Sequence, residues 1–271
     1  MDKYKTIAII PARYASTRLP GKLIKYEAKK YTGKFLIEHV YEKVKTAKNV
    51  QEVIIAADDE RIIEVVSQFS GCARMTSMHH KSGTDRIAEV ASQLDVDFVV
   101  NVQGDEPDIR GNMIDALIET MYSEREAVMC TLANVISSED EFMNPNVVKI
   151  VLDNDDYALY FSRAPIPFVR DKDNEFEFTT KEKKIGGVQG SKKTTFSFLK
   201  HLGIYIYRKD FLLAYSKLPA SGLEDAEKLE QLRVLSNGYK IKVVVTPYTC
   251  EGVDTPEGFE RFIDRYRIRK K

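Results

Sequence analysis

Apolar runs alternate with amphipathic stretches along the first hundred residues. The apolar runs predict strands at residues 7–11, 53–57, 74–76 and 98–102. Amphipathic stretches with helical spacing predict helices at residues 36–47, 58–69 and 84–94, the second with Asp58 or Asp59 as its N-cap. Because continuous apolar strands that alternate with helices form parallel sheets, we expect an α/β fold with a mostly parallel sheet and helices on both faces.

The second half of the chain is less regular. Its pattern predicts strands at residues 147–152, 157–161, 203–207 and 241–245, helices near 210–217 and 223–235, and a terminal helix after Asp254. A long polar stretch lies between Arg170 and His201. Long stretches without regular structure are uncommon inside compact domains. We therefore predict a single domain over residues 1–271, in which residues 171–200 form an inserted loop or hairpin as a smaller lobe.

Composition narrows the classes of partner. With 271 residues and 43% hydrophobic content, the chain can bury a large core. Basic and acidic residues both number 41, so we expect neither a nucleic acid nor an anionic membrane as partner, and any anion site must be a local cluster. The three cysteines are widely spaced, and neither a signal peptide nor a membrane-length apolar run is present. These features predict a soluble, cytoplasmic protein.

The segment after the first predicted strand carries three cations, Arg13, Arg18 and Lys22. Ligands of α/β sheets bind beyond the carboxyl ends of the strands, so this is a place where chemistry is expected. Arginine forks and a lysine point charge suit a triphosphate, and Gly21 gives backbone N–H groups room to approach phosphates. Neither the Walker nor the Rossmann glycine pattern is present. The alternative for this segment is a solvated cationic loop.

Two aspartates are candidate magnesium ligands with a structural alternative. Asp105 follows the strand at 98–102 and suits magnesium, although a turn acid ahead of Pro107 fits equally well. Asp254 precedes Pro256, and on this pattern alone an N-cap of the terminal helix is favoured.

Other polar residues give weaker signals. The adjacent His79 and His80 precede a helix and could meet a base or a phosphate, but they lack the spacing of zinc ligands. His201 is either a donor to a substrate carboxylate or a surface residue. Glu230 and Gln231 lie in a predicted helix rich in charged residues. The alternative to a functional role is that they lie on its solvated face.

Taken together, the motifs resemble the 3-deoxy-manno-octulosonate (Kdo) cytidylyltransferase family, the CMP-Kdo synthetases. They occur in that family's order, from about Ile9 to Glu260: IIPARYASTRLPGK, ADDERI, SGTDRIAEV, NVQGDEP, YFSRAPIP, HLGIYIYR, LEQLRVL and GVDTPE. The resemblance implies a nucleotide-diphospho-sugar transferase-like fold, a homodimer, and transfer of CMP from CTP to Kdo with release of pyrophosphate.

The resemblance also assigns roles to residues. It implies that Arg13, Arg18 and Lys22 bind the triphosphate, with Ser82 and Gln103 near the nucleotide. It implies that Asp105 and Asp254 jointly hold Mg²⁺, which replaces the capping role for Asp254. It places the following residues in the pocket for the sugar acid: Arg163, His201, Tyr205, Glu230 and Gln231. By this resemblance the catalytic set is Arg13, Lys22, Asp105 and Asp254.

Two features depart from the family pattern. Leu23 follows the loop lysine where the family commonly has proline, and the stretch between Arg170 and His201 is longer than expected. That stretch could cover the site, extend a dimer contact or tune which sugar acid enters. The acceptor is therefore Kdo or 8-amino-Kdo. The alternatives are a cytidylyltransferase for another nonulosonic acid and a catalytically silent nucleotide-binding protein of the same fold.

Overall fold

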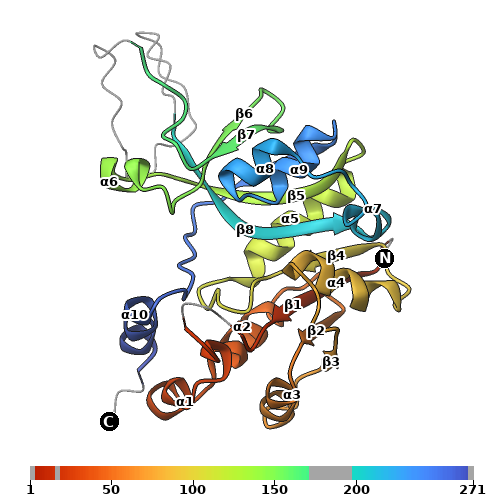
Figure 1. The fold of residues 1–271 in the computed structure, drawn as a ribbon, viewed down its shortest axis with the longest axis vertical. Helices are drawn as coiled ribbons and strands as arrows, with labels where there is room; N and C mark the ends of the chain where they lie inside the picture. Colours follow the sequence, from red (N-terminus) through yellow and green to blue (C-terminus); the bar gives the residue numbers. More distant parts are fainter. Residues whose placement is uncertain (1–3, 16–18, 171–196, 268–271) are drawn as a thin grey trace.

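The computed structural model describes residues 4–15, 19–170 and 197–267, and the structural statements below concern these ranges (Figure 1). A sheet in the order β3-β2-β1-β4-β8-β5-β9 runs through the molecule, and β6 and β7 extend it beside β8. Its first half contains β1 (Thr6–Ala12), β2 (Glu52–Ala57), β3 (Ala73–Met75) and β4 (Phe98–Asn101), all parallel. This arrangement confirms the predicted parallel sheet for the first hundred residues.

The second half of the sheet is mixed. The long strand β8 (Leu199–Arg208) runs antiparallel to β4 and to β5 (Ala127–Val135), and β9 (Lys240–Val245) is parallel to β5. The short strands β6 (Lys149–Leu152) and β7 (Ala158–Ser162) form an antiparallel pair at the end of β8. The strand β5 was not predicted, although it joins β8 to β9.

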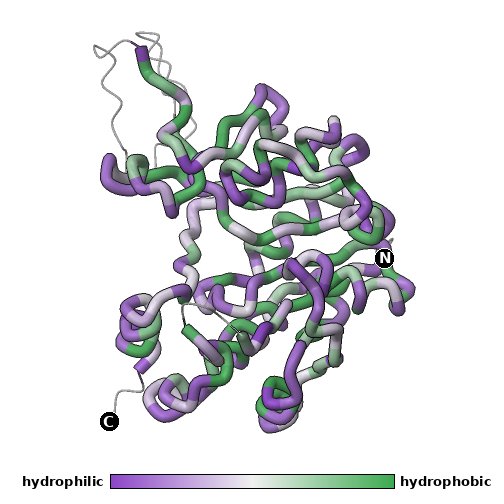
Figure 2. The backbone as a smooth tube through the Cα atoms, in the orientation of Figure 1, coloured by the Kyte–Doolittle hydropathy of each residue, from purple (hydrophilic) through white to green (hydrophobic). Residues whose placement is uncertain are grey.

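Alternate residues of β1 pack into two separate hydrophobic cores, one on each face of the sheet. Ile7 and Ile9 contact the core that includes α4 (Gly83–Ser92), α7 (Lys209–Tyr215) and α9 (Gln231–Ser236). The core on the other face includes α2 (Leu36–Val44), α3 (Glu60–Ser67), α5 (Gly111–Ser123) and α10 (Pro256–Tyr266). Figure 2 shows hydrophobic segments following the strands between these layers. Helices on both faces are thus confirmed.

Several predicted elements need correction. The single helix expected at 223–235 is two, α8 (Gly222–Glu227) and α9, because Lys228 adopts a left-handed conformation with φ of 54° that ends α8. Four helical elements were not predicted: η1 (Lys22–Ile24), α1 (Tyr26–Thr32), α5 and α6 (Glu139–Met143). Residues 171–196 of the predicted insertion at 171–200 lie outside the described residues. Its last two residues, Leu199 and Lys200, belong to β8. Within the described ranges, every helix is too short or too polar to cross a membrane.

Candidate active site

The segment after β1 folds back on itself at Tyr14 and Gly21. The Gly21 N–H donates to the Tyr14 carbonyl at 3.0 Å. Gly21 has a φ of +64°, and a Cβ there would lie 3.3 Å from the Tyr14 ring, so glycine suits the position for both reasons. The fold-back returns the chain to the end of the strand, where Lys22 begins η1. Arg13 is exposed, whereas the predicted triphosphate ligand Arg18 lies outside the described residues.

Lys22 brings the two predicted magnesium ligands together. Its ammonium group forms a short ion pair with the Asp105 carboxylate and lies 3.5 Å from the Asp254 carboxylate. It also donates to the Val253 carbonyl at 2.9 Å, and the Val253 N–H donates to the Asp105 carbonyl at 2.8 Å. Segments after β1, after β4 and before α10 therefore meet at one point.

The structure decides the question of the helix cap. The N-cap of α10 is Thr255, whose hydroxyl accepts from the Gly258 N–H at 3.1 Å. The N-cap role favoured for Asp254 by local sequence is therefore wrong. The Asp254 carboxylate is turned toward Lys22 and Asp105 instead.

The Asp105 and Asp254 carboxylates fit a divalent cation. Both approach the same ammonium group, which shows that they can share one positive charge. Carboxylate oxygens are the ligands that Mg²⁺ prefers. In the part of the chain that the structure describes, no group of three or more His, Cys, Asp or Glu side chains is arranged to hold a metal. A magnesium ion held by this pair would take further ligands from phosphate oxygens and water.

Glu106, which the sequence interpretation did not single out, lies directly beside this site. Its Oε2 atom is buried and has no hydrogen-bond partner among the described residues. Burial, together with the charges of Asp105 and Asp254, raises the pKa of Glu106 to about 8. At pH 7 the buried environment of the Glu106 carboxyl therefore favours its neutral form, which adds no charge to the pair.

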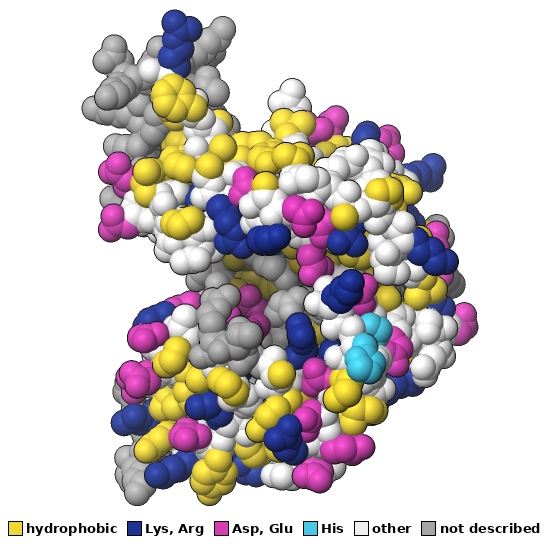
Figure 3. Space-filling model, viewed as in Figure 1, with side chains coloured by type: hydrophobic (Ala, Val, Ile, Leu, Met, Phe, Trp, Pro, Cys, Tyr) yellow, Lys and Arg dark blue, Asp and Glu magenta, His cyan; other side chains and the backbone are white. Residues whose placement is uncertain are grey.

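A cavity of about 260 Å³ opens from the carboxyl end of β4, in the cleft between the two halves of the molecule (Figure 3). Gln103 lines it only two residues before Asp105, which places the cavity next to the carboxylate pair. The wall also contains three predicted sugar-pocket residues, Tyr205, Glu230 and Gln231. The structure thus brings four of the predicted residues together.

Hydrogen bonds tie the polar groups of this cavity to one another. The Thr84 hydroxyl donates to Glu230 Oε2 at 2.8 Å, and the Tyr205 hydroxyl donates to Gln231 Oε1 at 3.4 Å. Gln231 Nε2 is buried and has no protein acceptor within the described ranges, so it is a donor that a ligand could use. Burial raises the pKa of Tyr205 well above its ordinary value and also raises that of Glu230, although Glu230 keeps an exposed side.

His201 and Arg163 do not lie on the described wall of the cavity. His201 is neither a surface residue nor free to titrate near neutrality, because burial lowers its pKa to about 3. Its Nε2 lies 2.9 Å from the Thr131 hydroxyl, and its ring packs against Tyr205 at a centroid distance of 5.3 Å. Arg163 Nε donates to the Glu227 carbonyl at 2.7 Å. In this conformation His201 packs against the wall residue Tyr205, whereas Arg163 is bonded to Glu227.

The segment that contains His79 and His80 leads into α4. Ser82 is the N-cap of α4, accepting from the Asp85 N–H at 3.1 Å, and the next residue, Gly83, lines the cavity. His80 pairs with Glu89 on α4. Ser82 therefore lies next to the cavity-lining Gly83, and its place near the nucleotide stays a prediction from the resemblance.

The sequence matches the family described as Cytidylyltransferase over residues 7–241. A 3-deoxy-manno-octulosonate cytidylyltransferase of Geotalea daltonii is 48% identical over 265 residues, which cover 98% of this chain and 99% of that protein. The protein of the same name from Thermodesulfovibrio yellowstonii is 47% identical over 263 residues, covering 94% of this chain and 95% of that one.

Solved structures show the same relationship. A CMP:2-keto-3-deoxy-manno-octonic acid synthetase solved with CTP superimposes with a TM-score of 0.84 and 39% identity, covering 96% of this chain and 98% of that one. A putative glucose-1-phosphate thymidylyltransferase from Bacillus anthracis has a TM-score of 0.62 at 15% identity, covering 98% of this chain and 97% of that one. The second likeness shows the fold alone.

Proposed function

This chain belongs to the 3-deoxy-manno-octulosonate cytidylyltransferase family, and from that membership we propose that it transfers CMP from CTP to the anomeric hydroxyl of Kdo. The products are pyrophosphate and CMP-Kdo, the activated sugar for lipopolysaccharide synthesis. One observation carries the proposal at the level of residues. Lys22, Asp105 and Asp254, from three distant segments, meet beside a polar cavity that starts at Gln103.

In nucleotide transfer the cations bind the phosphates and the carboxylates hold the metal ion. The anomeric oxygen attacks the α-phosphorus and loses its proton, and the bond from the α-phosphorus to the bridging oxygen of pyrophosphate breaks. Such transfers depend chiefly on positioning and on neutralising phosphate charge. Arg13 and Lys22 supply positive charge on the chain itself. We propose that Asp105 and Asp254 hold Mg²⁺, which when bound neutralises the phosphates and the leaving pyrophosphate.

The cavity wall suits a hydroxylated acid. Gln231 Nε2 is a buried donor that lacks a protein acceptor in the described structure, and the Tyr205 hydroxyl remains protonated at physiological pH. Neutral donors of this kind can bind sugar hydroxyls without repelling the carboxylate of the acid. We propose that Arg163 and His201 complete the sugar pocket once the substrate is bound.

We also propose a cytoplasmic homodimer. Exposed apolar side chains near β6 and β7 support a protein contact at that end of the molecule, since Leu159 is 61% exposed and Phe168 is 88% exposed.

The test is release of pyrophosphate from CTP and magnesium with Kdo, 8-amino-Kdo or N-acetylneuraminate as the acceptor. We expect release with Kdo. A clear preference for 8-amino-Kdo would identify that amino sugar as the acceptor. A preference for N-acetylneuraminate would indicate that the acceptor is another nonulosonic acid. No release with any of the three would favour a silent nucleotide-binding protein.

A further inference from the structure

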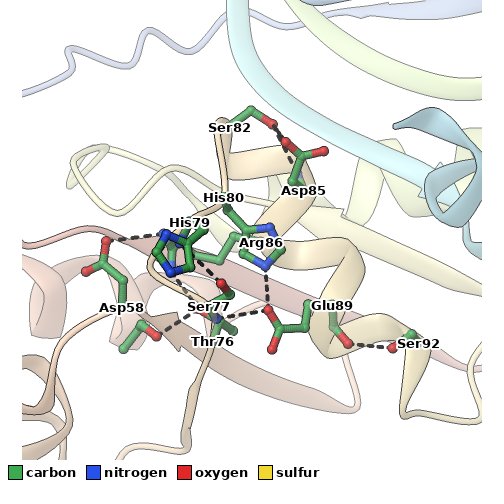
Figure 4. A network of polar contacts seen from close by, with 11 residues as sticks. Asp58, Thr76, Ser77, His79, His80, Ser82, Asp85, Arg86, Glu89 and Ser92 are labelled. Carbon is green, nitrogen blue, oxygen red and sulfur yellow. Dashed lines mark hydrogen bonds and ion pairs between the residues drawn. The ribbon is translucent and has the colours of Figure 1, made fainter. Parts of the chain in front are cut away.

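Arg86 is the largest fully buried side chain of the protein's described part, with an exposed fraction of 0%. It lies on α4 and points toward the strand ends (Figure 4). One terminal nitrogen donates to the Thr76 hydroxyl at 2.5 Å, and the other donates to Asp58 Oδ2 at 3.2 Å. Burying a guanidinium is costly unless it is paired. An arginine at this buried position therefore has a role that a charged surface residue does not have.

Asp58 connects this buried cation to the nucleotide side of the site. It follows β2, and its second oxygen, Oδ1, accepts from the Tyr14 N–H at 2.9 Å. It is not the cap of α3, because that role belongs to Asp59. One carboxylate thus joins the guanidinium of Arg86 to the backbone of Tyr14.

Tyr14 is the point at which the segment after β1 is held. Its N–H is bound by Asp58, its carbonyl accepts from Gly21, and the Arg61 guanidinium lies 3.4 Å from the centre of its ring. Arg13 precedes Tyr14, and Lys22 follows Gly21. The position of Tyr14 therefore sets the positions of both described cations that are assigned to the triphosphate.

Charge gives a second reason for an arginine at position 86. An unpaired Asp58 carboxylate beside Arg13 would weaken the attraction for phosphate. Arg86 cancels that charge from the interior, so Asp58 can hold the backbone of Tyr14 without cancelling Arg13. Burial lowers the pKa of Arg86, Asp58 opposes this change, and the charge of Arg13 adds to it, which shows that the three charges are close.

We propose that Arg86 is a positioning residue for CTP, which holds Arg13 and Lys22 in place through Asp58 and Tyr14 and neutralises the Asp58 carboxylate. This inference rests on the proposed function. A glutamine at position 86 would leave Asp58 charged and unpaired beside the triphosphate. Removal of the Asp58 charge in the same chain should then restore part of the binding of CTP.

The experiment compares the full-length wild type with Arg86→Gln, Asp58→Asn and the double variant. The Michaelis constants for CTP and for Kdo, kcat and the melting temperature are measured for each. Asp115→Asn is the matched control. The Asp115 carboxylate also accepts backbone N–H groups, from Lys48 at 2.8 Å and Asn49 at 2.9 Å. These residues precede β2, whereas Asp58 follows it, so the control lies at the opposite end of the strand.

We expect Arg86→Gln to raise KM for CTP about tenfold or more, while KM for Kdo changes less than about twofold. In the double variant, KM for CTP should be at least about threefold lower than in Arg86→Gln. Asp115→Asn should lower the melting temperature and leave KM for CTP unchanged. If Arg86→Gln does not fold, Thr76→Val removes one acceptor of Arg86 and should raise KM for CTP about threefold.

An unchanged KM for CTP in both Arg86→Gln and Thr76→Val would overturn the inference, as would a double variant that binds CTP no better than Arg86→Gln. The same experiment separates this failure from failure of the proposed function. A wild type that releases no pyrophosphate from CTP and Kdo contradicts the proposed function. An active wild type with unaffected variants contradicts only the role of Arg86.

Discussion

Replacing Glu106 by glutamine should make the protein more stable, and the gain should grow with pH. Glu106 lies next to the carboxylates of Asp105 and Asp254, and its Oε2 atom is buried without a hydrogen-bond partner in the described structure. Glutamine has nearly the same shape and carries no charge. The substitution therefore removes a buried acid while it preserves the packing against Gly252, where a Cβ would lie 3.4 Å from the Glu106 carboxyl.

The magnitude follows from the raised pKa. Burial raises the pKa of Glu106 from 4.5 to about 8, so the folded protein holds a proton that the unfolded chain has lost. Across this interval the free energy of unfolding falls as pH rises, by about 1.4 kcal/mol per pH unit. The whole interval corresponds to about 5 kcal/mol of lost stability. This value is a ceiling, because local opening that admits water lowers the cost of the charged form.

Urea denaturation in magnesium-free buffer with EDTA measures the effect. Between pH 6 and pH 8 we expect the difference in unfolding free energy between Glu106→Gln and wild type to grow by about 2 to 3 kcal/mol. The buried His39 and His201 have lowered pKa values, of about 4 and about 3, and reduce stability only as pH falls below their ordinary value of 6.5. Their effect cancels in the difference.

A glutamate on the surface provides the control for this experiment. Glu260 is exposed on α10, and Glu260→Gln should give a difference from wild type that does not change with pH. A constant difference for Glu106→Gln over the same pH range would refute the reasoning, since it would show that Glu106 is charged in the folded protein.

Three further outcomes are expected. Asp105→Asn should reduce pyrophosphate release at limiting magnesium by about a hundredfold or more, whereas near-normal turnover would reject its role as a metal ligand. Gly21→Ala should cost about 1 to 2 kcal/mol in calorimetry and weaken CTP binding, because it places a Cβ at positive φ; Gly222→Ala, in open space, is the control, and equal melting temperatures for the two would contradict the argument. Because His201 stays neutral above about pH 4, kcat/KM for Kdo should show no ionisation of this residue between about pH 5.5 and 7. An acid limb that disappears in His201→Gln would count against this assignment.

The first half of the fold was predictable because its strands are continuous apolar runs. Residues 53–57 and 98–102 are buried on both faces, so their composition reveals both the strand and the parallel sheet. The strand β5 escaped prediction because buried polar residues, Thr131 and Asn134, interrupt its pattern. The break between α8 and α9 was invisible because Lys228, a residue that favours helices, adopts positive φ there.

The site residues also fall into those that the sequence identified and those that only the structure revealed. Arg13, Lys22 and Asp105 were identified from their place after apolar strands. Motif order supplied the cavity residues Tyr205, Glu230 and Gln231 and the partner of Asp105. Local sequence pointed to the wrong role for Asp254, because Asp254 and Thr255 are both good caps and only the structure shows that Thr255 takes that position. Arg86 and Glu106 were overlooked as site residues, since each stands in a charged stretch that is typical of a solvated surface.

By itself, the sequence therefore determined the layered α/β architecture, the cationic segment after the first strand and the family to which the motifs point. These are properties of neighbouring residues, carried by hydrophobic period, charge and short motifs. Only the tertiary structure decided that Lys22 lies between Asp105 and Asp254, that burial raises the pKa of Glu106, and that Arg86 reaches Tyr14 through Asp58. Each of these depends on burial and on contacts between distant segments, because the charge state and partner of an ionisable group follow from the surroundings that the folded chain builds around it.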